Sequence, residues 1–143
     1  MGLTEAGHTE SDPQAIIPLL TLAACPVEGR DAGSPRLTGK LKVSLTPDSL
    51  AYAVYQQDEV SEAFNCNYEL NPDYRGVMEM SGIVVSGVSP DGGARIIELP
   101  NAAHPFYLAT GFLPQLSSSP GKPHPVVTAL LQNALGFHEQ YNH

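Results

Sequence analysis

The chain has 143 residues, the size of one average domain, and a formal net charge of −8 from 15 acidic and 7 basic residues. It contains no basic stripe, so nucleic acids and anionic membranes are not expected as partners. No segment reaches the roughly 18 to 20 consecutive apolar residues of a membrane span, and the first residues do not resemble a signal peptide. Two cysteines, Cys25 and Cys66, are too few for a disulfide framework. The composition therefore predicts a cytoplasmic protein with reduced thiols.

The first third of the chain predicts two strands joined by a long loop. Residues 16–22 form a short apolar run, which is typical of a buried strand. Residues 37–46 alternate between apolar and polar side chains, as a half-buried strand does. The polar segment 25–36 between them is rich in turn formers and is expected to be a loop. The two strands are candidates for an antiparallel pair at a sheet edge.

Two Pro-Asp pairs predict helix starts in the middle of the chain. Thr46 is the expected N-cap of a helix over residues 46–57, because proline follows at the first helical position and aspartate favours the N-terminal dipole. Asn71 repeats this chemistry before a second helix, which Gly82 is expected to close. The alternation of residues 64–70, between these helices, predicts a single strand.

The last part of the chain predicts a hairpin, a strand and a helix. Apolar segments flank the turn sequence at residues 89–93, which indicates a β-hairpin. Residues 106–112 read as another strand, and a Pro-rich loop over 117–125 precedes a final helix. Apolar residues recur at helical spacing in that helix, at Val126, Val127, Leu130, Leu131 and Ala134. Together these elements predict one compact layered domain of mixed α and β structure, or a large piece of one.

No common catalytic or metal-binding motif is present. The Gly-rich turn lacks the Lys-Ser/Thr of a phosphate-binding loop, and the five histidines form neither HxH nor HExxH. In a nucleophile elbow, the nucleophilic residue lies between closely spaced glycines on a strand-to-helix turn. Neither Cys25 nor Cys66 lies in such a sequence. Both thiols are therefore interpreted as structural, and no metal or cofactor is predicted.

From Asn65 onward, four segments follow one another in a specific order: NYELNPDY, MSGIVVSGVSPDGGARIIELP, HPFYLATGFLPQLSSSP and KPHPVVTALLQNA. They resemble the glutaminase domain of the CTP synthase family, a class I glutamine amidotransferase. The resemblance spans nearly the whole chain and is clearest from Tyr68 to Ala134. It implies an α/β fold, namely part of a class I glutamine amidotransferase-like (flavodoxin-like) three-layer domain with antiparallel hairpins.

The departures from the family pattern concern catalysis. The family's catalytic His and Glu lie in a Phe-His-Pro-Glu motif, and the matching residues here are Leu113 and Gln115. Leucine accepts no proton, and glutamine does not stabilise an imidazolium as a carboxylate does. The basic run that helps hold the glutamine carboxylate in the family is replaced by Phe64, Asn65, Cys66 and Asn67. By the same resemblance, a remnant of the glutamine pocket is expected at Cys66, Asn67, Tyr68 and Glu69.

The resemblance places the family's cysteine nucleophile before Met1. Residues 1–143 are thus expected to form a single amidotransferase-like domain without the N-terminal half that carries the nucleophile elbow. Without those strands, the strand over 106–112 and the last helix would lack partners. A truncated chain, an assembly that completes the sheet and a rearranged smaller fold are the alternatives, and a homo-oligomer or a protein partner that completes the sheet is favoured over a stable monomer.

Three functional interpretations remain open. The first is a catalytically degenerate module that binds a protein or a small molecule, or that self-associates. The second is an enzyme of altered chemistry that acts on a small amine or carboxylate near the old pocket. The third is a fragment of a CTP-synthase-related amidotransferase, which would hydrolyse glutamine in pyrimidine nucleotide biosynthesis.

Overall fold

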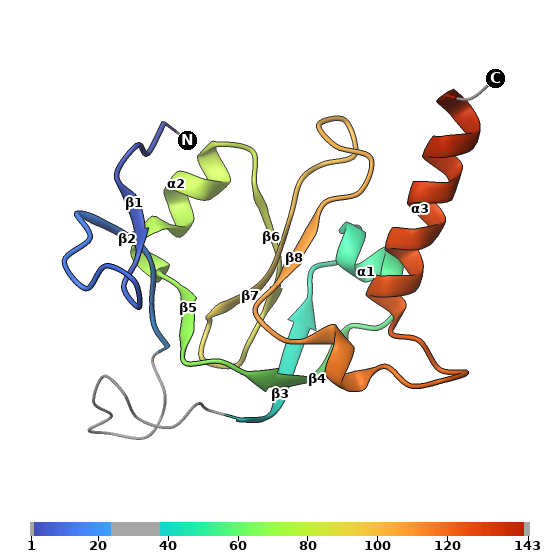
Figure 1. Cartoon of the computed structure of the whole chain (residues 1–143), viewed down its shortest axis with the longest axis horizontal. Helices are drawn as coiled ribbons and strands as arrows, with labels where there is room; N and C mark the ends of the chain where they lie inside the picture. Colours follow the sequence, from blue (N-terminus) through green and yellow to red (C-terminus); the bar gives the residue numbers. More distant parts are fainter. Residues whose placement is uncertain (1, 24–37, 142–143) are drawn as a thin grey trace.

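The computed structural model describes residues 2–23 and 38–141, and its strands form two sheets (Figure 1). The smaller sheet has the order β1-β2-β5, made of β1 (Ala6–His8), β2 (Ile17–Leu22) and β5 (Tyr68–Leu70). The larger sheet has the order β4-β3-β6-β7-β8, made of β3 (Thr38–Leu45), β4 (Glu59–Asn65), β6 (Val84–Val88), β7 (Ala94–Glu98) and β8 (Leu108–Thr110). The larger sheet is antiparallel at every pairing, whereas β1 and β2 run parallel.

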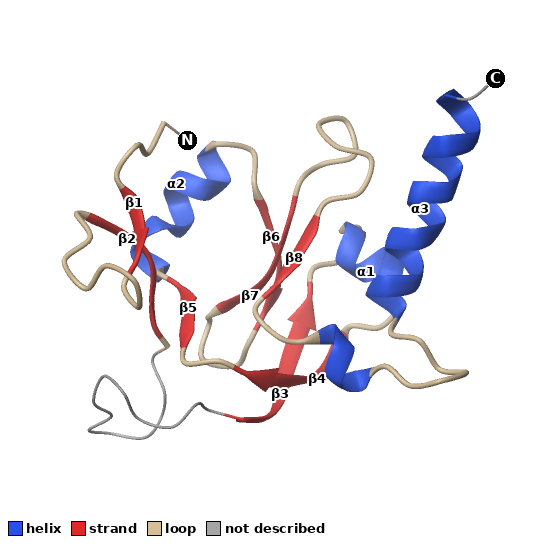
Figure 2. Cartoon of the chain, in the orientation of Figure 1, coloured by secondary structure: helices blue, strands red, loops and turns tan. Residues whose placement is uncertain are grey.

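The helices lie at opposite ends of the molecule (Figure 2). The described helices are α1 (Leu50–Tyr55), α2 (Arg75–Met80) and α3 (Pro125–Tyr141), with short 3-10 helices η1 (Pro72–Tyr74) and η2 (Pro114–Ser117). Helix α2 contacts β6, while α1 contacts β6, β7 and α3. The predicted hairpin, the Asn71-capped helical segment and the final helix are thus confirmed.

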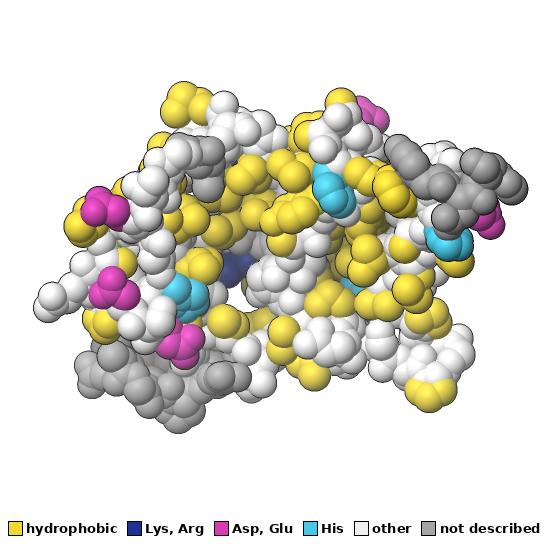
Figure 3. Space-filling view, turned by 45° about the horizontal axis from the view of Figure 1, so that its top comes forward, with side chains coloured by type: hydrophobic (Ala, Val, Ile, Leu, Met, Phe, Trp, Pro, Cys, Tyr) yellow, Lys and Arg dark blue, Asp and Glu magenta, His cyan; other side chains and the backbone are white. Residues whose placement is uncertain are grey.

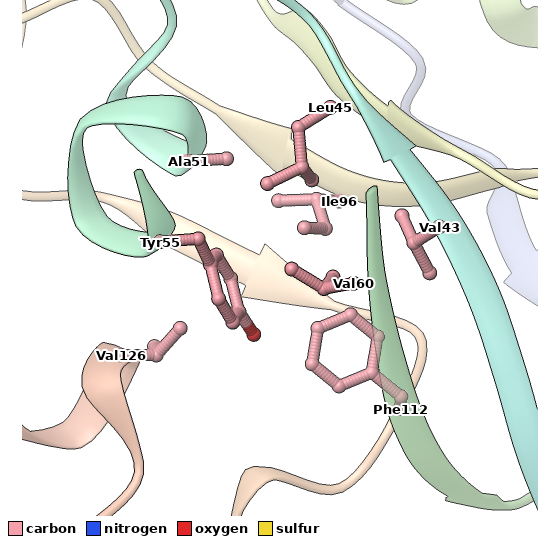
Figure 4. Packing of buried hydrophobic residues seen from close by; sticks show 8 residues of the cluster. All are labelled: Val43, Leu45, Ala51, Tyr55, Val60, Ile96, Phe112 and Val126. Carbon is pink, nitrogen blue, oxygen red and sulfur yellow. The ribbon is translucent and has the colours of Figure 1, made fainter. Parts of the chain in front are cut away.

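The hydrophobic core lies between α1, the start of α3 and one face of the larger sheet (Figure 4). Its buried members are Val43, Leu45, Ala51, Tyr55, Val60, Ile96, Phe112 and Val126. Ile96 is fully buried and packs directly over Gly87, where an added Cβ would lie 2.7 Å from the Ile96 side chain. A glycine is therefore needed opposite Ile96, because a larger residue would displace the centre of the core.

Helix α1 begins three residues later than the sequence predicts. Asp48 has a positive φ of 63°, so the expected first turn at Thr46 is interrupted, and Ser49 is the N-cap instead. Ser49 Oγ accepts a hydrogen bond from the Tyr52 amide at 3.0 Å. The buried Glu98 carboxylate on β7 accepts the first two helical N–H groups, from Leu50 at 2.8 Å and from Ala51 at 3.0 Å. A negative charge from a distant strand thus stabilises the N-terminus of this helix.

The single strand expected over residues 64–70 is wrong, because the chain changes sheets inside it. Strand β4 ends at Asn65 in the larger sheet, and β5 starts at Tyr68 in the smaller one. The Tyr68 amide donates to Cys66 Sγ at 3.4 Å across this bend. Alternation cannot reveal such a change, since both strands keep the period of two.

The expected pairing of strands 16–22 and 37–46 is also wrong. Strand β2 pairs with β1 and β5, whereas β3 pairs with β4 and β6 in the other sheet. The strand predicted at 16–22 is only half-buried, because its neighbours β1 and β5 are each three residues long. Ile16 lies outside β2 and is exposed. Strand 106–112 shortens to Leu108–Thr110. The loop predicted over 25–36 lies outside the described residues.

A buried polar network holds the base of α3 against the rest of the fold. His124 Nε2 lies 3.0 Å from Glu62 Oε1, and the Tyr55 hydroxyl donates to the same oxygen at 2.8 Å. The Val126 amide donates to His124 Nδ1 at 3.2 Å, so a neutral ring carries its proton on Nε2 and donates it to Glu62. The network joins α1, β4 and the start of α3, and its three side chains are buried.

None of the helices in the described ranges is long and apolar enough to span a membrane.

We predict that Glu98→Ala lowers the free energy of unfolding by about 2–4 kcal/mol, because two buried helical N–H groups lose their acceptor. Urea denaturation followed by circular dichroism measures the change. Glu59→Ala is the control, because its ion pair with Lys42 is on the surface, where solvent screening leaves little contribution to stability. Equal losses in the two variants would contradict the capping role of Glu98.

A second prediction concerns alkaline pH. Burial and the neighbouring Glu62 raise the pKa of Tyr55 far above its ordinary value of 10.0. Since the folded-state pKa lies above the unfolded one, the stabilisation is fully present below about pH 10 and is lost as the pH rises above that value. Between pH 8 and pH 10.8, the free energy of unfolding is therefore expected to decrease more in the wild type than in Tyr55→Phe. Equal falls in the two proteins, or a larger fall in the variant, would show that Tyr55 does not contribute through its hydroxyl.

Candidate functional site

A pocket of about 340 Å³ lies between the two sheets. Its walls are mainly apolar, formed by Leu20, Leu70, Ala94, Ile97, Ala109, Phe112 and Leu113. Polar groups reach it from His8, Asn65, Cys66, Tyr68 and Thr110. Figure 3 shows a hollow in the surface with a basic side chain at its floor and hydrophobic side chains around it. An apolar concave site with a few polar groups is the usual form of a small-molecule site.

A buried ion pair forms the floor of the pocket. Arg95 Nη2 lies 2.7 Å from Glu69 Oε2, and both side chains are more than nine-tenths buried. Arg95 is the second residue of β7 and Glu69 is the middle residue of β5, so the pair connects the larger sheet to the smaller one. Gly93 lies against this pair, and a Cβ at that position would be 2.8 Å from Arg95 Nη2. Position 93 thus requires a residue without a side chain, because a larger residue would prevent the two charges from approaching this closely.

The hairpin turn holds the other side of the Arg95 guanidinium. Arg95 Nε donates to Ser89 Oγ at 2.7 Å, and Nη2 lies 3.3 Å from Asp91 Oδ2. Ser89 in turn donates to Asp91. Partial burial raises the pKa of the Asp91 carboxyl, but hydrogen bonds from Ser89 and the Gly93 amide, together with the charge of Arg95, outweigh it and hold this pKa below its ordinary value. Arg95 is therefore fixed in position before any ligand arrives.

The rings of His8 and Tyr68 form one wall of the pocket, with centroids 4.6 Å apart and planes tilted by 57°. The Glu10 amide donates to His8 Nδ1 at 3.1 Å, so a neutral His8 ring carries its proton on Nε2 and can act as a donor. Cys66 is an exposed free thiol on the rim of the same pocket.

The structure brings together four of the six residues singled out by the sequence. Cys66, Tyr68, Glu69 and Leu113 all line the pocket. Asn67 and Gln115 are not among its lining residues: the Asn67 carbonyl accepts the Ala23 amide at 2.7 Å, and Gln115 lies exposed in η2. Leu113 is held in the wall by its amide, which donates to the Ala63 carbonyl at 3.0 Å.

Sequence reasoning missed His8, Thr110 and Arg95. Arg95 left a detectable signal, because it is the one cation in the largely apolar stretch ARIIEL, whose other charge is Glu98. A strand position next to the core predicts burial and hence a paired charge. His8 and Thr110 left no such signal, since each joins the pocket only through the packing of the two sheets. Within residues 2–23 and 38–141, no group of three or more His, Cys, Asp or Glu side chains is placed to hold a metal ion.

Comparison with known proteins identifies relatives. No family model matches the chain. It is 39% identical over 140 residues to CTP synthase from Acidothermus cellulolyticus and 38% identical over 137 residues to that from Nostoc punctiforme, covering 94% and 95% of this chain. CTP synthase from Methanococcus aeolicus is 36% identical over 134 residues. The chain spans only about a quarter of the length of these relatives (25% in each case).

A solved structure shows the fold. The glutaminase domain of Trypanosoma brucei CTPS, solved with bound acivicin, matches with a TM-score of 0.83 and 22% sequence identity. The match covers 94% of this chain and 52% of that one. The predicted fold class, part of an α/β class I amidotransferase domain with antiparallel hairpins, is confirmed by this match. Sequence and fold together show that the chain is homologous to the glutaminase-domain region of CTP synthases.

Proposed function

We propose that the chain is a catalytically degenerate amidotransferase-like module of the cytoplasm that binds a small molecule in the pocket between its sheets and does not hydrolyse glutamine. The observation that carries this proposal is Leu113. It stands where the family motif has its catalytic histidine, and it contributes an apolar surface to the pocket wall. Glutamine hydrolysis by a cysteine nucleophile requires a base at that point, and an alkyl side chain cannot supply one.

The second catalytic position supports the same conclusion. Gln115 stands where the family has its catalytic glutamate, and it is exposed outside the pocket lining. An exposed amide does not orient a neighbouring imidazole, and it does not stabilise the positive charge of the imidazolium as a buried carboxylate does. Loss of both groups of a catalytic unit lowers the rate by about 10⁴- to 10⁶-fold.

The lining of the pocket favours a largely apolar ligand with one polar end. The charges of Arg95 and Glu69 lie against each other, so an added carboxylate would have to compete with an existing ion pair. The hydroxyl of Thr110 and the imidazole of His8 offer neutral hydrogen-bonding groups on the walls. A cavity of this size fits a small molecule of amino-acid dimensions.

A second candidate function rests on Cys66. Its thiol is exposed on the rim of the same pocket, so it could act as a nucleophile in altered chemistry on a small amine or carboxylate. We rank this lower, because Cys66 Sγ accepts a hydrogen bond from the Tyr68 amide, and no side chain in the described part of the chain lies within hydrogen-bonding distance as a base.

We predict that the purified chain releases no ammonia from L-glutamine above the buffer control. A coupled glutamate dehydrogenase assay measures the release, and CTP synthase from Acidothermus cellulolyticus is the positive control. Turnover that disappears in Cys66→Ser would overturn the proposal in favour of the altered enzyme. Turnover that persists in this variant would require another nucleophile and would equally contradict it.

We also predict that Ala109→Phe abolishes small-molecule binding, because the new ring fills the pocket. A fragment library screened by protein-observed NMR should shift the amide signals of residues 94–97 and 109–113 in the wild type but not in this variant. Ala102→Phe is the matched control, since Ala102 is exposed in a loop outside the pocket lining. If fragment hits shift other regions of the protein, or if Ala109→Phe leaves the shifts unchanged, the pocket is not the binding site.

A further inference from the structure

The guanidinium of Arg95 has one nitrogen that the fold does not use. Nε of Arg95 donates to Ser89 Oγ at 2.7 Å. Nη2 donates to Asp91 Oδ2 at 3.3 Å and lies 2.7 Å from Glu69 Oε2. In the part of the chain that the structure describes, no acceptor contacts Nη1. The two N–H groups of this nitrogen therefore remain for a ligand in the pocket that Arg95 lines.

The burial of Arg95 makes Nη1 a strong binding group. The side chain is only 9% exposed, and three neighbouring side chains already fix its position. A buried charged donor without an acceptor raises the free energy of the folded protein. A ligand atom that accepts a hydrogen bond from Nη1 removes this cost. Because the guanidinium is held in place beforehand, little conformational entropy is lost when the ligand binds.

The charges around Arg95 decide which kind of acceptor suits the pocket. Two carboxylates, Glu69 and Asp91, face one guanidinium, so these three groups carry more negative than positive charge. A ligand carboxylate would add another negative charge and would lose its hydration among apolar walls. A cationic ligand brings no acceptor for Nη1 and places its charge against the guanidinium. An uncharged carbonyl oxygen accepts the hydrogen bond without either cost.

We propose that the pocket takes an uncharged carbonyl compound, a lactam or a carboxamide with an apolar ring, whose oxygen accepts a hydrogen bond from Arg95 Nη1. This inference rests on the proposed function, and it specifies the chemical class of the ligand and the nitrogen that recognises it. The walls at Leu20, Leu70 and Ile97 suit the apolar ring. Free amino acids do not fit this class, because their carboxylate and ammonium groups would both lose hydration there.

The test compares three probes that share one shape and differ in charge. At neutral pH, naphthalene-2-carboxamide is uncharged, naphthalene-2-carboxylate is an anion and naphthalene-2-carboxamidine is a cation. Titration of the isotope-labelled full chain, followed by protein-observed NMR, gives a Kd for each probe from the amide signals of residues 94–97 and 109–113 around the pocket. We expect the carboxamide to bind at least tenfold more tightly than either charged probe.

Two substitutions separate the roles of the charges. Arg95→Lys keeps a positive charge near Glu69 but has no guanidinium edge, so the preference for the carboxamide should fall below twofold. Asp91→Asn removes one negative charge and leaves Arg95 in place, so the affinity for the carboxylate relative to the carboxamide should rise at least threefold. This second variant decides the matter if Arg95→Lys does not fold. Asp58→Asn is the matched control, because Asp58 is exposed outside the pocket lining, and it should leave the ratio unchanged.

The outcomes distinguish this inference from the proposed function. If no probe or library fragment shifts the signals of residues 94–97 and 109–113, both are wrong. If the pocket binds all three probes equally, it is a binding site but Nη1 does not select the ligand, and this inference alone is overturned. Tighter binding of the carboxylate would likewise overturn it. Tighter binding of the amidine would show that Glu69 and Asp91, rather than Arg95, recognise the ligand.

Discussion

The ion pair between Glu69 and Arg95 is the contact on which the relative position of the two sheets depends. Each charge would cost several kcal/mol if it were buried without a partner, so the strands that carry them, β5 and β7, are held together. The hairpin turn reinforces this by fixing the guanidinium through Ser89 and Asp91. The pocket exists because this contact connects the sheets at the floor while their apolar faces remain apart above it.

The same arrangement separates the contacts that stabilise the fold from the lining of the pocket. Glu98, Glu62 and His124 hold α1 and α3 in place through buried hydrogen bonds, and none of them lines the pocket. The wall at Leu113 can therefore become apolar without disturbing the contacts that stabilise the domain. This explains how the chain keeps the fold of a CTP synthase glutaminase domain, with a TM-score of 0.83, while its pocket wall carries the apolar side chain of Leu113.

Local sequence patterns predicted the burial of side chains correctly where this burial depends on a single strand or helix. The alternation in β3 correctly placed Val43 and Leu45 in the core and Lys40 and Lys42 in solvent, because the side-chain period of a strand is fixed by its backbone. The capping rule failed at Thr46, because Asp48 has a positive φ of 63° and Ser49 becomes the N-cap, while the buried Glu98 from β7 accepts the first two helical N–H groups. No local rule detects a cap supplied by a distant strand.

By itself, the sequence determined the resemblance to the CTP synthase glutaminase domain and the mixed α/β class, since these depend on the order and identity of side chains. Only the tertiary structure decided that residues 64–70 divide between two sheets, that His8 and Thr110 join the pocket, and that Arg95 pairs with Glu69. These features are contacts between segments far apart in the chain, and their geometry depends on how the sheets pack rather than on any local pattern.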